Sequence, residues 1–473
     1  MKRTAAVILV LFCVQWIHGQ ISFRNQFKFT NWQDYDTDKL AGPNLLLNWA
    51  DLTYQHDWFS IGLRYEINLP PDPYIFENDT LLNQYDLTFR YAEFYFNDFT
   101  ATIGTFYTIF GRGLTLRTYE ERNLRVDNNI DGIRFNYDGS FVRAQVLAGK
   151  MRDKYNRRED TVYGADAEIK PLNDLTIGGS FLRQNEPGDQ FSQIWAARLK
   201  YSYQWLEFYG ELVRPDWYDA YSYYASLNAV LGQFAITGEY KDYDHLSFRN
   251  SFGQEYNAPP SLSREHTFTY LNRHPHALNL DDEVGYQVEV NWFPSDEWEI
   301  ILNHSRTDMH SGVTAFKEYY ADVHNYFNAD LEWRVAGALT YDLTTNTDNI
   351  TPIAEVYMNV NELDQIHLSF QHQHTKNLSD LSEYDNNMLI VEFTRSPWLN
   401  VAIVGEETNQ HLLTNVNMDK HTWLYATATF TFWNNQQVSV LYGSRREGFV
   451  CVGGICRYEP EFQGLELKFT MRL

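Results

Sequence analysis

The sequence lacks any apolar run long enough to form a membrane-spanning helix. Its longest apolar run is Ala5–Ile17, 13 residues, whereas a helix that crosses a bilayer needs about 20 residues. The mean hydropathy is −0.47, and 21% of the residues are charged. These values exclude a helical membrane protein.

Basic residues are also scarce, with 38 lysines and arginines against 62 aspartates and glutamates and a formal net charge of −24. Nucleic acid binding needs a basic surface, so nucleic acid is not expected as a partner. Aromatic residues are abundant instead, at 16% of the chain. A disordered chain has few aromatic residues, so this chain is expected to fold.

The chain contains only three cysteines. Cys13 lies in the first apolar run, whereas Cys451 and Cys456 enclose a short segment with Gly453 and Gly454 at its centre. Two glycines permit the tight turn that would bring these two sulfur atoms together. In an exported chain such a pair favours a local disulfide. The alternative, half of a zinc site, lacks a second pair of ligands.

The first residues have the pattern of a secretory signal peptide. Two basic residues precede the apolar run, and Gly19 follows it as the small residue before a cleavage site. We therefore expect residues 1–19 to be removed and residues 20–473 to form one domain. A lipoprotein signal at Cys13 is disfavoured, because Phe12 occupies a position that requires a small residue.

Alternation of apolar and polar residues recurs from the first mature residues to the last. Clear examples are residues 59–69, 286–292, 331–340 and 424–432. A period of two indicates a β-strand with two different faces, and no segment shows the helical period of 3.6. The chain is therefore expected to be all-β.

The connections between these strands alternate in length. Eleven short links and twelve long polar links separate the segments, which gives 24 strands, with a range of about 20 to 26. This asymmetry is typical of a transmembrane up-and-down antiparallel β-barrel with short periplasmic turns and long extracellular loops. A secreted β-propeller would also have many strands, but it would not need this alternation of short and long links.

Six tryptophans lie beside short links, as an aromatic girdle at one membrane interface predicts. The alternative is that they are core residues at strand ends. They are Trp58, Trp205, Trp292, Trp298, Trp398 and Trp433.

The last strand alternates up to the final residue. Outer-membrane barrels typically end on such a strand, which the barrel assembly machinery recognises. Many end in Phe, and the final Leu of this chain departs from that pattern. The expected assembly signal is Leu465, Leu467, Phe469, Met471 and Leu473.

A barrel in lipid must pair every backbone group, so the sheet closes with its apolar face outward and its polar face inward. The inward positions have charges of both signs, so pairs across neighbouring strands are expected. Such pairs either stiffen a hydrated wall or bias solutes mildly toward cations. About two dozen strands enclose a wide lumen, so loops must narrow it, a partner must fill it, or the barrel must be flattened.

Two long links are candidates for loops folded into the lumen. In residues 111–131, Gly111 and Gly113 permit a sharp bend, and the dense charges suit a constriction held by salt bridges. A solvated surface loop is the alternative. The length of residues 244–282 suggests a function or a lid. The constriction candidates are Arg112, Arg117, Glu120, Glu121, Arg122, Arg125, Asp127 and Asp131, and those of the second loop are Arg264, Arg273, His274 and His276.

Several motifs resemble those of an uncharacterised family of large bacterial outer-membrane β-barrels. The resemblance covers nearly the whole mature chain and implies an outer-membrane location without implying any activity. The motifs are Phe-Gly-Arg-Gly at 110–113, Asn-Asn-Ile-Asp-Gly at 128–132, Leu-Asn-Arg-His at 271–274, Asp-Glu-Val-Gly-Tyr-Gln at 282–287, residues 451–457 and Phe-Gln-Gly at 462–464.

Signals for an enzyme are weak. His372 and His374 share one strand face but lack a third metal ligand, and no nucleophile has a specific spacing to a histidine. We expect no catalytic residue, metal or cofactor.

The favoured function is therefore a porin-like channel for small solutes in the outer membrane of a Gram-negative bacterium. The alternative is a non-conducting structural or secretion-associated barrel that docks a lipoprotein or a surface partner. Expected contacts are outer-membrane lipid, lipopolysaccharide and the barrel assembly machinery. The sequence leaves the solute and the oligomeric state open.

Overall fold

A computed structural model of the chain describes residues 19–33, 44–72, 74–76, 81–186, 188, 190–273, 276–410, 421–433, 436–452 and 455–473. The predicted signal peptide lies outside these ranges except for Gly19. Within them, no helix has the length and apolar character needed to cross a membrane.

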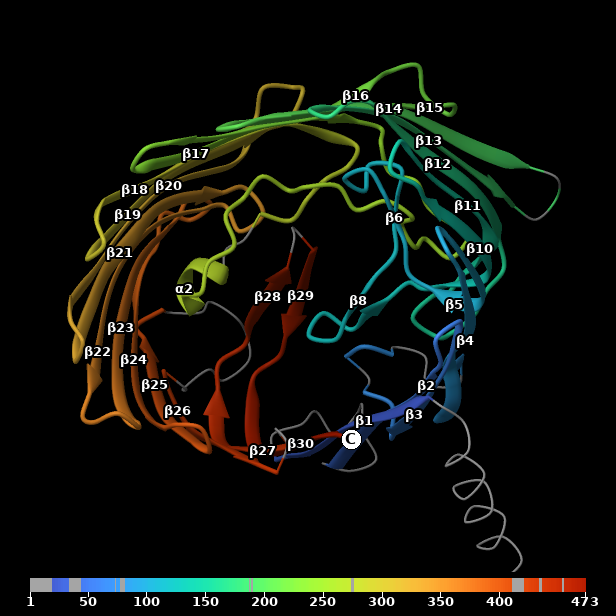
Figure 1. Cartoon of the computed structure of the whole chain (residues 1–473). Helices are drawn as coiled ribbons and strands as arrows, with labels where there is room; N and C mark the ends of the chain where they lie inside the picture. Colours follow the sequence, from blue (N-terminus) through green and yellow to red (C-terminus); the bar gives the residue numbers. More distant parts are fainter. Residues whose placement is uncertain are drawn as a thin grey trace, which may run out of the picture.

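The structure is a closed ring of 24 antiparallel strands (Figure 1), which confirms the predicted fold class. Each strand pairs with its neighbours in the order of the wall. In that order the wall strands are β1 (Gln20–Trp32), β2 (Asn44–Gln55), β3 (Phe59–Leu69), β4 (Tyr85–Phe96), β5 (Phe99–Phe106), β10 (Ile130–Asp138), β11 (Val142–Met151), β12 (Thr161–Leu172), β13 (Leu175–Asn185), β14 (Phe191–Tyr203), β15 (Leu206–Pro215), β16 (Ser222–Leu231), β17 (Phe234–Asp244), β18 (Asp282–Ser295), β19 (Trp298–Asp308), β20 (Thr314–Asn328), β21 (Leu331–Asp342), β22 (Thr347–Asn359), β23 (Asp364–Asn377), β24 (Glu383–Arg395), β25 (Leu399–Thr408), β26 (Thr422–Phe432), β27 (Gln436–Arg445) and β30 (Phe462–Arg472).

The ring closes where β30 pairs with β1, a junction that we call the seam. Phe27 lies opposite Phe469 in this pairing, and Leu473 exchanges two backbone hydrogen bonds with Phe23. The residues of the predicted assembly signal therefore lie in or directly after the strand that closes the ring. Their recognition by the assembly machinery stays a prediction.

The two faces of the wall differ as the alternation predicts. On β3, Ile61 and Leu63 point outward and are each 43% exposed, whereas Ser60 and Arg64 on either side of this pair are buried inside the ring. Five of the six tryptophans beside the short links are also strongly exposed, namely Trp58, Trp205, Trp292, Trp398 and Trp433. The outer surface is thus apolar and has an aromatic belt near its short turns.

Ion pairs across neighbouring inward strands are present, as expected. One group of pairs skips a strand: Arg198 on β14 reaches past β13 to contact Asp166 and Glu168 on β12 at 2.7 and 2.9 Å. Arg334 on β21 contacts Asp322 on β20 at 2.5 Å. These pairs bridge the wall without occupying the centre of the ring.

Three of the long links fold into the ring. The first inner loop, 107–129, contains β6 (Ile109–Phe110), β7 (Leu116–Arg117), β8 (Glu120–Glu121) and β9 (Val126–Asp127); the second, 245–281, contains α2 (Thr269–Asn272); the third, 446–461, contains β28 (Gly448–Val452) and β29 (Ile455–Glu459). In Figure 1, α2, β8, β28 and β29 lie inside the circle of wall strands.

The inner face is not polar throughout, and here the sequence-based expectation was wrong. Five neighbouring strands each carry an apolar, buried inward residue in the half toward the long links: Leu147, Val162, Leu182, Ile194 and Val213. They form one core with side chains of the first two inner loops. Each buried aliphatic side chain contributes roughly 1.5–3 kcal/mol, so this part of the wall holds the loops by apolar packing.

Candidate lumen constriction

The first inner loop bends against β15 through its two glycines. Gly111 and Gly113 have φ angles of +54° and +87°, which glycine adopts without strain. A Cβ on Gly111 would stand 2.5 Å from the Glu211 carboxylate. That carboxylate accepts hydrogen bonds from the Arg112 N–H at 2.9 Å and the Tyr209 hydroxyl at 2.5 Å. The loop backbone is therefore fixed at the wall where it turns inward.

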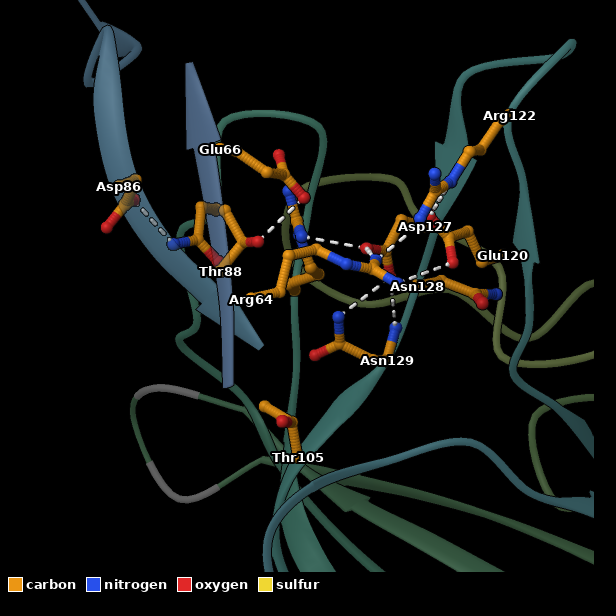
Figure 2. Close-up of polar contacts among 12 residues, drawn as sticks. Arg64, Glu66, Asp86, Thr88, Thr105, Glu120, Arg122, Asp127, Asn128 and Asn129 are labelled. Carbon is orange, nitrogen blue, oxygen red and sulfur yellow. Dashed lines mark hydrogen bonds and ion pairs between the residues drawn. The ribbon is translucent and has the colours of Figure 1, made fainter. Parts of the chain in front are cut away.

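Charged side chains at the tip of this loop contact the nearby wall strands β2 and β3, and Figure 2 shows the contact with Arg64 of β3. The Arg64 guanidinium on β3 donates to both oxygens of Glu120, at 2.9 and 3.0 Å, and to Asp51 on β2 at 2.6 Å. Arg122 donates to Glu120 at 2.7 Å and lies 3.5 Å from Asp51. Because the Arg64 side chain is only 9% exposed, loss of its partners would leave a poorly solvated charge.

Asp127 extends this network away from the tip. Its carboxylate lies 3.8 Å from Arg64 and accepts a hydrogen bond from Arg152 at 2.8 Å. The Tyr107 hydroxyl and the Asn129 amide donate to it at 3.0 and 2.7 Å. The base of the loop and its tip are thus linked to the same group of charges.

Two other candidates of this loop lie apart from the network. Arg117 donates to the Ala258 carbonyl of the second inner loop at 3.3 Å. Asp131 belongs to β10 rather than to the loop, and its carboxylate is 3.2 Å from Arg90. Neither residue contacts the charged tip.

The last two candidates lie at the tip without an ion pair within the described residues. Glu121 accepts only a backbone N–H, from Asn123, at 2.9 Å. The Arg125 guanidinium lies 5.6 Å from the centre of the Trp49 ring on β2. Sequence reasoning thus identified the loop partners Glu120, Arg122 and Asp127 but missed their wall partners, because the separation in sequence gave no signal of them.

The second inner loop crosses the ring by a series of ionic contacts. Its Arg264 contacts Glu289 on β18, and Arg273 binds Glu406 on β25 through two hydrogen bonds. His276 lies 2.7 Å from Glu283. The remaining candidate, His274, lies outside the described residues.

The first two inner loops are joined by backbone hydrogen bonds. The Arg117 N–H donates to the Tyr256 carbonyl at 2.8 Å, and the Ala258 N–H donates to the Gly113 carbonyl at 3.0 Å. The Asn257 amide donates to Leu114 at 3.0 Å. Movement of one loop would therefore strain the other.

The third inner loop was not predicted to fold inward. Its Arg446 lies 3.3 Å from Glu406, the carboxylate that also binds Arg273, so the second and third loops share one wall anchor. In its hairpin Cys451 lies directly opposite Cys456 in register. The pair of glycines between the cysteines in the sequence was the available signal for this hairpin.

The described residues contain no group of three or more metal-ligating side chains. His372 and His374 contact Asn387 and Asp385 on the next strand, at 2.8 and 2.9 Å. The inner surface instead presents paired charges and hydrogen-bonding groups around the loop tips.

A family model matches the whole chain, residues 1–473, and it describes a family of unknown function, DUF6029. The chain belongs to this family. A comparison with curated proteins finds no match.

Among solved structures, a chain of the E. coli P pilus tip assembly intermediate PapC-PapD-PapK-PapG has a TM-score of 0.55 at 10% identity, over 96% of this chain and 60% of that chain. This chain thus spans less than two thirds of the length of that one, and the likeness shows the fold alone. The P pilus usher (PapC) translocation pore scores 0.47 at 10% identity, over 96% of this chain and 99% of that one. The Pseudomonas aeruginosa siderophore receptor PirA scores 0.47 at 11%, over 96% and 80%. These two scores are too low to support an argument.

The register of the third inner loop generates a prediction about its cysteines. Opposite positions in an antiparallel pair are close enough for a disulfide, so Cys451 and Cys456 should be linked in the exported protein. Alkylation of the unfolded protein followed by mass spectrometry should label neither cysteine before reduction and both cysteines after it. Labelling of both without a reductant would contradict the disulfide.

The ionic network at the loop tip generates a second prediction. The substitution Glu120→Gln removes the negative charge that Arg64 and Arg122 share. We expect it to lower the free energy needed to open the first inner loop by about 2 kcal/mol. Tryptic cleavage within residues 107–129 of the folded protein should then be about tenfold faster or more.

The matched control is Glu121→Gln. It removes the neighbouring carboxylate, which has no ion pair within the described part of the chain, so its cleavage rate should stay near that of the unchanged protein. Equal cleavage of the two variants would show that the network does not hold the loop.

Proposed function

We propose that the protein is an integral β-barrel of the bacterial outer membrane. Its closed sheet leaves no unpaired strand edge, and its outward side chains are apolar with a belt of tryptophans. A lipid environment requires both features.

Within that membrane, we propose that it acts as a channel for small solutes, narrowed by its three inner loops and without a catalytic role. The observation that supports this most is a pair of cavities that adjoin at the loop tips and are lined in part by charged side chains. A cavity of about 690 Å³ lies on the seam side, and one of about 410 Å³ lies between the first and second inner loops. Arg125 and Arg457 line both cavities, so these two side chains lie where the cavities meet on the proposed path.

Planar bilayers test the proposal. The purified full-length protein should produce discrete single-channel steps, and Arg125→Ala should enlarge them, because this side chain lies between the two cavities. Arg214→Ala is the control, since this exposed arginine pairs with Asp219 and lines neither cavity. A correctly folded protein that never conducts would reject the channel and favour a sealed barrel that docks a partner.

A further inference from the structure

The seam-side cavity is built from seven parts of the chain. Five are the wall strands β1, β2, β3, β27 and β30, and the other two are the tip of the first inner loop and β29 of the third inner loop. The wall and the loops contribute charged side chains from opposite sides. A solute of small-molecule size would therefore be surrounded by fixed groups.

The charge of this cavity has the opposite sign to that of the chain. Eight basic but only four acidic residues line it, whereas the chain has a net charge of −24. The Glu466 carboxylate forms ion pairs with two lysines, Lys28 at 2.7 Å and Lys468 at 2.8 Å. The Glu459 carboxylate likewise forms ion pairs with two arginines, Arg445 at 2.8 Å and Arg457. Each of these carboxylates thus leaves one positive charge without a counter-charge.

Two further arginines of the cavity, Arg24 and Arg125, have no carboxylate within ion-pair distance among the described residues. Arg125 and Arg122 lie over the same Trp49 ring, at 5.6 and 5.3 Å. Burial lowers the pKa of Arg125, and the nearby Arg457 guanidinium lowers it further. A guanidinium stays charged even so, and its fork of donors matches the oxygens of an anion.

We propose that this cavity binds a small solute with at least two anionic oxygens, a carboxylate or phosphate compound, and that such anions are the substrate class of the channel. The second half of this statement rests on the proposed function. The excess of cations is the feature that recognises the solute, because an anion would neutralise charges that no side chain neutralises. The net negative charge of the chain alone would instead favour cations.

Isothermal titration calorimetry of the full-length protein in detergent tests the site. The probes are succinate and inorganic phosphate, with glucose as the neutral control. We expect saturable binding of at least one anion that weakens as salt is added, because salt screens charges. Binding of succinate alone assigns carboxylates, and binding of phosphate alone assigns phosphates. No saturable binding of either anion, or equal heats with glucose, would overturn the proposal.

Two variants locate the binding. Arg125→Gln and Arg24→Gln each remove one unpaired cation, and each should weaken anion binding about tenfold, since one charge-assisted hydrogen bond is lost. Arg24 is exposed on the wall, so its variant should fold even if the Arg125 variant does not. The control is Arg214→Gln, an exposed arginine paired with Asp219 outside the cavity. Equal affinities in all three variants would also overturn the proposal.

The calorimetry and the bilayer measurement can fail separately. Conductance without anion binding would leave the channel standing and reject this site. Anion binding without conductance would keep the site and reject the channel.

Discussion

The rest of the structure depends on the pairing of β30 with β1. This pairing removes the last open edge of the sheet and so allows every strand to hydrogen bond on both sides. A ring of 24 strands, however, is too wide for its own inward side chains to fill. The closed wall therefore needs material from elsewhere in the chain, and the three inner loops supply it. Their sequences explain how they are held and what space they leave.

Two kinds of interaction hold the inner loops, and they act on different parts of the wall. Toward β11–β15 the loops bury aliphatic and aromatic side chains against inward apolar residues, which excludes water. Toward the seam and β3, ion pairs and hydrogen bonds of Arg64, Glu120, Asp127 and their neighbours fix the first inner loop at discrete points. A polar cavity remains between these contacts. The proposed path for solutes accordingly follows the charged side. Its excess of cationic side chains gives the path a preference for anions, which the net negative charge of the chain conceals.

Most of the wall could be predicted from the sequence, because each strand alternates apolar and polar residues with a period of two. The length of each link between strands also indicates at which end of the barrel it lies. The apolar inner patch could not. At Val146–Leu147 and Val162–Tyr163 both faces of the strand are apolar, so alternation alone gives no sign that the inward residue is dry. The ionic partners were hidden for another reason. Arg64 and Glu120 are 56 residues apart, and the inward fold of the first inner loop brings them together.

The account rests centrally on the position of the first inner loop inside the ring, beside the seam. Electron paramagnetic resonance with one spin label at Asn123, on the loop tip, and one at Thr470, on β30, measures this position directly, since both residues line the seam-side cavity. The account predicts a short distance with a narrow distribution for the protein in lipid. A broad distribution centred at long distances would place the loop outside the ring and contradict it.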